Sequence, residues 1–188
     1  MNNQWTIPGT VLTIKRSDAV RVPEMFQTMF LTGGVVLSQV TKITGLEPYA
    51  VQNWVKRGFL RAPLHKQYDL DQVCRVILIN TFKNVLPMER ICGLLSYVNG
   101  RLDDASDDLI RDSHLYFMFV RLAGRAREIS GADQAQALID EYLADYVEPV
   151  PGASARVAKV LRVMLIAWLA SRMRQAAESA LDEMEKEE

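Results

Sequence analysis

The stretch from Leu37 to Tyr68 constrains the fold more than any other part of the chain. Ser38 is expected to cap a short helix. Gly45 is expected to end that helix, because a glycine turns the chain through positive φ without steric strain. Pro48 then suits the first turn of a second helix, since its missing N–H needs no partner there. The sequence therefore predicts a helix, a tight turn and a second helix.

The second helix, which Gly58 is expected to end, has two distinct faces. Val51, Trp54 and Val55 recur at a spacing that buries one side of a helix. The other side carries aromatic, amide and basic side chains, namely Tyr49, Gln52, Asn53 and Lys56. An outward row of this kind is what a helix needs to read base edges in a DNA major groove.

A short basic segment from Arg61 to Tyr68 follows this helix. Pro63 restricts its loop, and its basic side chains are expected to reach solvent or phosphate, which positions a protein on DNA without reading sequence. Together the segments predict a winged helix-turn-helix with a small β wing. We expect Arg57, Arg61 and Lys66 to contact phosphates and Tyr68 to brace the wing.

The run TGLEPYAVQNWVKRGFLRAP, closed by HKQY, resembles the DNA-binding head of the MerR-type regulators. The next segment, DLDQVCRVILINTFKNVLPMERICGLL, is similar to the helix pair that follows the wing in those proteins. This resemblance implies a mostly α fold, with a winged head, a C-terminal helical region and a long last helix through which two copies pair. Gln52 stands where such regulators usually carry an arginine, so the resemblance implies no target sequence.

A narrower resemblance covers roughly residues 22–120. The segments QNWVKRGFL, KQY, INTFKNVL and LLSYVNGRLDDASDDLI look like a bacterial family known only as domain of unknown function 1836. That family implies no activity of its own, so any functional implication comes through the MerR-like head.

The sequence predicts five parts along the chain: an N-terminal arm (1–21), the winged domain (22–100), a helical extension (101–147), a linker (148–152) and a long helix (153–188). The linker contains two prolines and a glycine, which cannot continue a helix. The long helix carries an apolar stripe that is either a dimer interface or a core face within its own chain. The stripe includes Val157, Leu161, Met164, Leu165 and Trp168.

The charge distribution indicates what kind of partner the protein binds. The net charge is −1, yet residues 37–84 carry seven Lys and Arg against three acids. A basic segment on a near-neutral chain suits a protein that binds nucleic acid by one face.

The two cysteines, Cys74 and Cys92, are isolated and complete no zinc set with the two distant histidines. This cysteine usage, with no signal peptide and no apolar run long enough for a bilayer, predicts a cytoplasmic protein.

The clearest candidate for metal chemistry is an acidic run, DDASDD, which contains Asp103, Asp104, Asp107 and Asp108. Paired carboxylates on one helix face can hold a divalent cation, but this run has no central glycine and no closing glutamate. Helix capping and a solvated surface explain the acids better. No catalytic motif or phosphate-binding glycine loop occurs, so we expect neither an enzyme nor a cofactor.

The leading hypothesis is a homodimeric transcriptional regulator that binds double-stranded DNA. A first alternative is a protein-interaction module that uses the same scaffold without touching DNA. A second is a sensor of a small-molecule effector, with a pocket lined by Tyr116, Phe117, Phe119 and Trp168. The dependence of binding on salt separates the first two, because counterions compete with protein for DNA phosphates.

Overall fold

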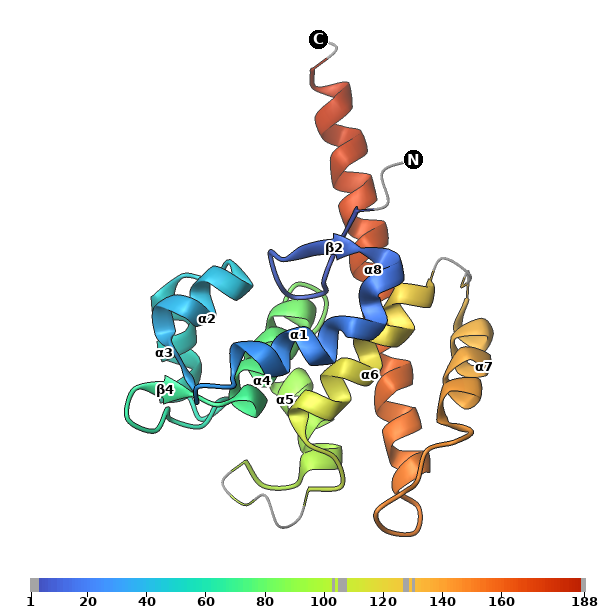
Figure 1. Ribbon diagram of the computed structural model, residues 1–188. Coiled ribbons are helices and arrows are strands. Elements are labelled where there is room, and N and C mark those ends of the chain that lie inside the picture. Colours follow the sequence, from blue (N-terminus) through green and yellow to red (C-terminus); the bar gives the residue numbers. More distant parts are fainter. Residues whose placement is uncertain (1–3, 103, 105–107, 127–128, 130, 187–188) are drawn as a thin grey trace.

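The computed structural model describes residues 4–102, 104, 108–126, 129 and 131–186. Over these ranges the chain is mostly helical, as the sequence predicts, with two small two-stranded sheets and a long last helix. Its elements are β1 (Gln4–Thr6), β2 (Thr13–Lys15), the 3-10 helix η1 (Arg16–Arg21), α1 (Val22–Met29), β3 (Val35–Val36), α2 (Leu37–Thr44), α3 (Pro48–Lys56), β4 (Gln67–Tyr68), α4 (Leu70–Phe82), α5 (Met88–Asn99), α6 (Asp112–Arg125), α7 (Ala132–Leu143) and α8 (Ala153–Met184). Helices α2 and α3 lie to one side of a helical bundle, and the end of α8 projects beyond it (Figure 1).

Residues 4–21, which belong to the predicted N-terminal arm, form β1, β2 and η1. Strands β1 and β2 pair antiparallel as a hairpin. Trp5 and Ile7 are buried in the core. The hydroxyl of Tyr116, which is also fully buried, donates a hydrogen bond to the Pro8 carbonyl at 3.0 Å. The N-terminal hairpin is therefore part of the bundle, and Tyr116 fastens it to α6.

Helix α4 runs through the centre of the molecule. Its start is set by Asp69: the Asp69 carboxylate accepts from the Gln72 N–H at 2.8 Å, and the Gln72 amide oxygen accepts from the Asp69 N–H at 2.9 Å. This reciprocal arrangement satisfies N–H groups that a helix start leaves unpaired. Every residue from 72 to 79 is buried, and α4 packs against α2, α5, α6 and α8.

The aromatic rings of α6 belong to this core. Phe119 packs on Phe82 and Trp168, with ring centroids 5.4 and 6.4 Å apart. Tyr116 packs edge-on against Phe26 of α1, at 5.8 Å. Tyr116 and Phe119 are fully buried, so the predicted aromatic cluster fills the core and does not line one common pocket.

Helix α6 begins at Asp112, after the acidic run and not within it. Asp104 instead lies in the preceding loop, where its N–H bonds to the Arg101 carbonyl at 3.2 Å. Asp103 and Asp107 lie outside the described residues. Within the described ranges, no group of three or more acidic, histidine or cysteine side chains is placed to hold a metal ion.

Helix α8 has a buried half and an exposed half. Its stripe is buried by its own chain, against α4, α5, α6 and α7, which is the second of the two alternatives that the sequence left open. These buried residues include Val157, Leu161, Met164, Leu165 and Trp168. From Arg172 to Met184 every residue is exposed, and we call this part the projecting segment. No helix in the described part of the chain is both long and apolar enough to cross a membrane.

Candidate DNA-binding face

The turn between α2 and α3 is built as the sequence predicts. Gly45 adopts φ 70° and ψ 10°, a left-handed conformation, and its N–H closes α2 on the Thr41 carbonyl. Leu46 is buried beneath the turn, and Pro48 opens α3. The Asn80 amide of α4 donates to the Thr44 carbonyl at 3.0 Å, which fixes the end of α2 against the bundle.

The start of α2 is held differently from the prediction. Ser38 is not its cap. The Gln39 side chain reaches back and accepts from the Val36 N–H at 2.9 Å. Val36 also pairs with Gln67 as part of the β3–β4 sheet, so Gln39 ties the start of α2 to the strand that precedes it.

Helix α3 turns its apolar face inward and its polar face to solvent. Val51 and Trp54 are buried, whereas Val55 is half-buried. The predicted outward residues are all exposed, with Tyr49 at 73%. They are Tyr49, Gln52, Asn53 and Lys56.

The segment between α3 and α4 folds back as a tight hairpin. Leu64 and Gln67 form an antiparallel bridge, and the Gln67 N–H bonds to the Leu64 carbonyl at 2.8 Å. The two residues between them, His65 and Lys66, have φ of 48° and 64°. Positive φ at both central residues is the signature of a type I′ turn, which normally selects asparagine and glycine. The hairpin thus holds an exposed lysine in a conformation that disfavours side chains with a Cβ.

Two features brace this hairpin from below. Tyr68 is only 3% exposed, so its ring packs beneath the loop and is almost entirely shielded from solvent. Gly34 lies under β4, where an added Cβ would stand 2.8 Å from the Tyr68 carbonyl oxygen. A glycine is needed there to let the two chain segments approach. This role of Gly34 was not predicted from the sequence, although two adjacent glycines, Gly33 and Gly34, stand there.

A groove lies between α3 and the hairpin, and several of the predicted residues line it. It encloses about 510 Å³. Its walls are apolar, with Lys56 on one side and Lys66 on the other. The lining comprises Leu37, Gln52, Val55, Lys56, Pro63, Lys66 and Tyr68.

The predicted arginines lie outside this groove. Arg57 pairs with Glu89 at 3.1 Å, and its guanidinium lies 4.5 Å from the centre of the Phe59 ring. Arg61 pairs with Asp69 at 3.3 Å. Both pairs are well exposed, and such pairs contribute little and exchange readily with other partners.

Arg75 has a role that sequence reasoning missed, because a lone arginine on a helix is usually on the surface. It is buried in α4, where its Nε–H donates to the Phe59 carbonyl at 2.9 Å and Nη1 lies 3.2 Å from the Asp112 carboxylate. The Asn99 side chain also donates to Asp112, at 2.8 Å. Burial raises the pKa of Asp112 to about 6, although Arg75 acts in the opposite direction. One buried group thereby links the end of α3 to the start of α6.

Comparisons with known proteins identify the class of this region without giving it an activity. Residues 27–119 match the model of a family described as "Domain of unknown function (DUF1836)", so the chain contains a DUF1836 domain. The narrower of the two predicted resemblances is confirmed.

The match to a particular protein is short. The chain is 30% identical over 80 residues to "Uncharacterized protein YkrK" of Bacillus subtilis (strain 168). The aligned region covers 40% of this chain and 34% of that relative, so the chain spans about a third of the relative's length. No solved structure matches the chain.

Proposed function

We propose that the protein is a DNA-binding regulator and that residues 35–68, which we call the head, form a winged helix-turn-helix. The observation that carries the proposal is the pairing of an exposed polar face on α3 with an exposed lysine at a tight hairpin beside it. A helix that projects amide side chains can read base edges, and a basic hairpin beside it can contact the flanking phosphates.

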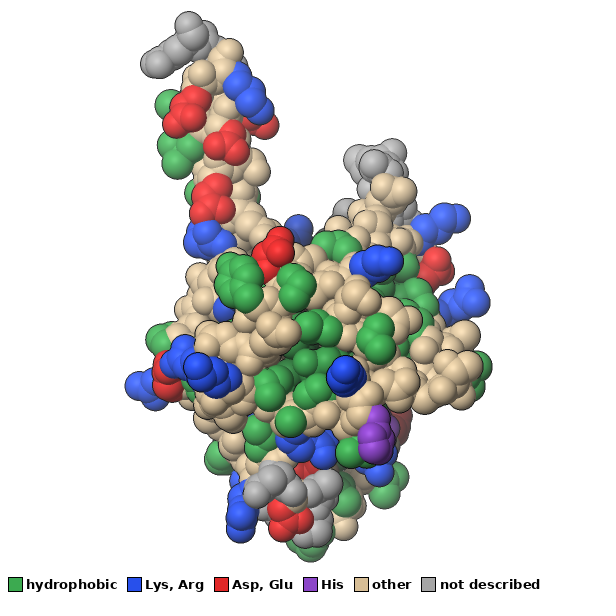
Figure 2. Space-filling model, turned by 90° about the vertical axis from the view of Figure 1, so that its left-hand side faces the viewer, with side chains coloured by type: hydrophobic (Ala, Val, Ile, Leu, Met, Phe, Trp, Pro, Cys, Tyr) green, Lys and Arg blue, Asp and Glu red, His purple; other side chains and the backbone are tan. Residues whose placement is uncertain are grey.

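The charge of the head supports this proposal. Figure 2 shows the side of the molecule on which the head lies, with basic side chains spread across it. In the head Gln52 and Asn53 would face bases, whereas Lys56 and Lys66 would contact phosphate from the two sides of the groove. Arg57 and Arg61 would exchange their exposed carboxylate partners for phosphates.

A single recognition helix reads few base pairs, so useful specificity requires two heads. The projecting segment of α8 is our proposed contact between two copies. Met173, Leu181 and Met184 are 73%, 59% and 65% exposed. Met173, Ala177, Ala180 and Met184 follow a spacing of four, three and four residues, which places them on one stripe of the helix.

The charges of the projecting segment favour an antiparallel pair. Arg172 and Arg174 lie at its base, whereas Asp182 and Glu183 lie at its tip. Acidic side chains are visible along the projecting column in Figure 2. An antiparallel arrangement sets the basic base of one helix against the acidic tip of the other, and a parallel one sets like against like.

The direct test is selection of random duplex DNA by the purified protein at low and high salt. We expect enrichment of a palindromic motif that is lost at high salt, because phosphate contacts release counterions. The variant Gln52→Ala/Asn53→Ala should fold normally and lose the sequence preference. An unchanged motif would show that α3 does not read the bases.

The groove favours a second candidate function, the binding of a peptide from another protein. Its apolar walls and two flanking lysines suit an amphipathic segment with acidic ends. A folded protein that enriches no DNA at either salt concentration would favour this candidate. Val55→Glu, which places an acid in the groove, should then abolish capture of the partner.

A further inference from the structure

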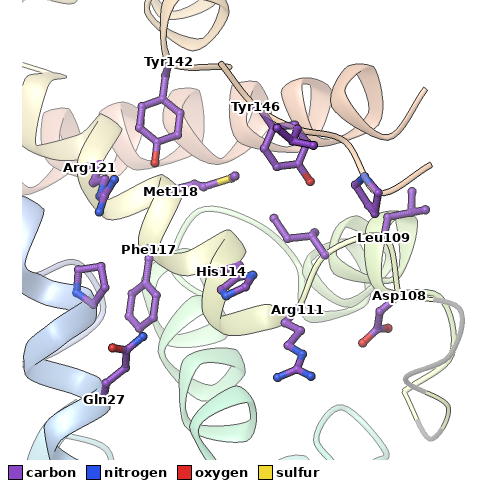
Figure 3. A pocket seen from close by; sticks show the side chains of 14 residues that line it. Gln27, Asp108, Leu109, Arg111, His114, Phe117, Met118, Arg121, Tyr142 and Tyr146 are labelled. Carbon is purple, nitrogen blue, oxygen red and sulfur yellow. The ribbon is translucent and has the colours of Figure 1, made fainter. Parts of the chain in front are cut away.

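A second hollow lies beside α6, close to the start of this helix. It encloses about 540 Å³ between α1, α6, α7 and the segment that leads into α8. This volume falls within the range typical of sites for small organic molecules. Figure 3 shows the side chains that line it.

The body of this hollow is apolar. Leu109, Phe117, Met118 and Val147 contribute to its walls, together with two prolines. Phe117 is the one member of the predicted aromatic cluster that lines this hollow. An apolar body of this size can take up the ring or chain of a small molecule.

Basic side chains from α6 and from the residue that precedes it border the apolar part. Arg111, His114 and Arg121 all line the hollow, and one acid, Asp108, lines it with them. His114 and Arg121 are seven residues apart, which corresponds to about two helical turns. Met118 lies between them on the same face. Within the part of the chain that the structure describes, neither the His114 side chain nor the Arg121 side chain has a hydrogen-bond or ion-pair partner.

Of the basic groups in the hollow, Arg121 is the best placed to bind an anion, because a second hydrogen-bond donor lies on the same side. In Figure 3 Arg121 extends from α6 on the side of the hollow where Tyr142 of α7 directs its hydroxyl group. A guanidinium supplies several N–H donors in a plane, and a phenol supplies one O–H donor. Together they match the oxygens of a carboxylate or a sulfonate.

We propose that this hollow binds a small organic anion with an apolar body, whose charged group pairs with Arg121. The apolar walls take up the body of the ligand, and Tyr142 donates a hydrogen bond to its charged group. The site lies apart from the head, and this inference does not depend on DNA binding. It requires only the geometry of α6 and α7.

The test uses two probes with the same apolar body. 8-Anilino-1-naphthalenesulfonate is an organic anion, and N-phenyl-1-naphthylamine is its neutral counterpart. Each is titrated by fluorescence against the wild-type protein, Arg121→Gln and the matched control Arg125→Gln. Arg125 lies one turn further along α6, pairs with Glu141 and does not line the hollow.

We expect Arg121→Gln to weaken binding of the sulfonate roughly fivefold, and to leave binding of the neutral probe unchanged. Arg125→Gln should bind both probes as the wild type does. Tyr142→Phe should weaken the sulfonate alone, by a smaller factor. The inference is wrong if the wild type shows no saturable sulfonate binding, if Arg121→Gln binds the sulfonate as tightly as the control, or if it loses both probes equally.

Discussion

The buried carboxylate of Asp112 makes a sharp prediction about how stability depends on pH. Its pKa rises from 3.8 to about 6, mainly because burial disfavours the charged form. The folded chain therefore binds this proton more tightly than the unfolded chain. The resulting stability is fully present below pH 3.8 and is lost as the pH rises to about 6.

The size of the effect follows from the same two values. Each pH unit between the folded and unfolded pKa corresponds to about 1.4 kcal/mol. As the pH rises across this range, deprotonation of Asp112 should therefore lower the free energy of unfolding by roughly 3 kcal/mol. The Asp112→Asn variant keeps the side chain neutral at every pH and retains an oxygen that can accept from Arg75 and Asn99.

The assay is urea unfolding followed by circular dichroism between about pH 4 and about pH 8. We compare the free energy of unfolding of Asp112→Asn with that of the wild type at each pH. As the pH rises, this difference should shift by roughly 3 kcal/mol in favour of the variant. Asp182→Asn, on the projecting segment, controls for the loss of one surface charge. If Asp112→Asn instead loses stability relative to wild type as the pH rises, attraction to Arg75 outweighs desolvation and the reasoning is refuted.

Four further changes test other parts of the structure. His65→Asn/Lys66→Gly should stabilise the chain by about 1 kcal/mol in urea unfolding, because both residues then tolerate the positive φ of the turn; no gain would mean that the turn is unstrained. Gly9→Ala should cost at least about 2 kcal/mol, since φ is +74° and the new Cβ would lie 2.4 Å from the Ile77 carbonyl oxygen; a thermal melt like that of the wild type would contradict the packing of the hairpin. Tyr116→Phe should cost about 1 kcal/mol by leaving the Pro8 carbonyl without its donor, and a neutral result would place water there. Met173→Glu/Leu181→Glu should yield a monomer in analytical ultracentrifugation without loss of thermal stability, because both side chains are exposed in one chain; an unchanged oligomeric state would exclude the projecting segment as the interface.

Local signals were enough to predict several elements of the fold. Gly45 and Pro48 predicted the turn and the start of α3, because each residue type has a backbone preference that suits few places in a fold. Asp69 is a local signal of the same kind, because an aspartate is a preferred residue at a helix start and its carboxylate accepts from a backbone N–H at the start of α4. The outward face of α3 followed from helical spacing alone.

Other features depend on partners that are distant in sequence. The strands β1 and β2 are three residues long each, too short to show a period, and they are held by contacts such as Tyr116 to Pro8. The stripe on α8 identified an apolar face correctly but could not say whether the same chain or a second one covers it. The hollow beside α6 also escaped the sequence analysis, since its walls come from α1, α6 and α7.

Arg75 links the position of the head to that of the helical bundle, so a movement of one should affect the other. Its guanidinium bonds to the Phe59 carbonyl, just after α3, and to Asp112, in the first turn of α6. Its side chain is 5% exposed, so water cannot readily replace either partner. A shift of the start of α6 relative to α4 must therefore break one of these contacts or carry the end of α3 with it. Arg111 and His114 of the second hollow flank Asp112 on either side. A ligand that repositions this first turn of α6 would change the buried Arg75 group, and through it the orientation of α3.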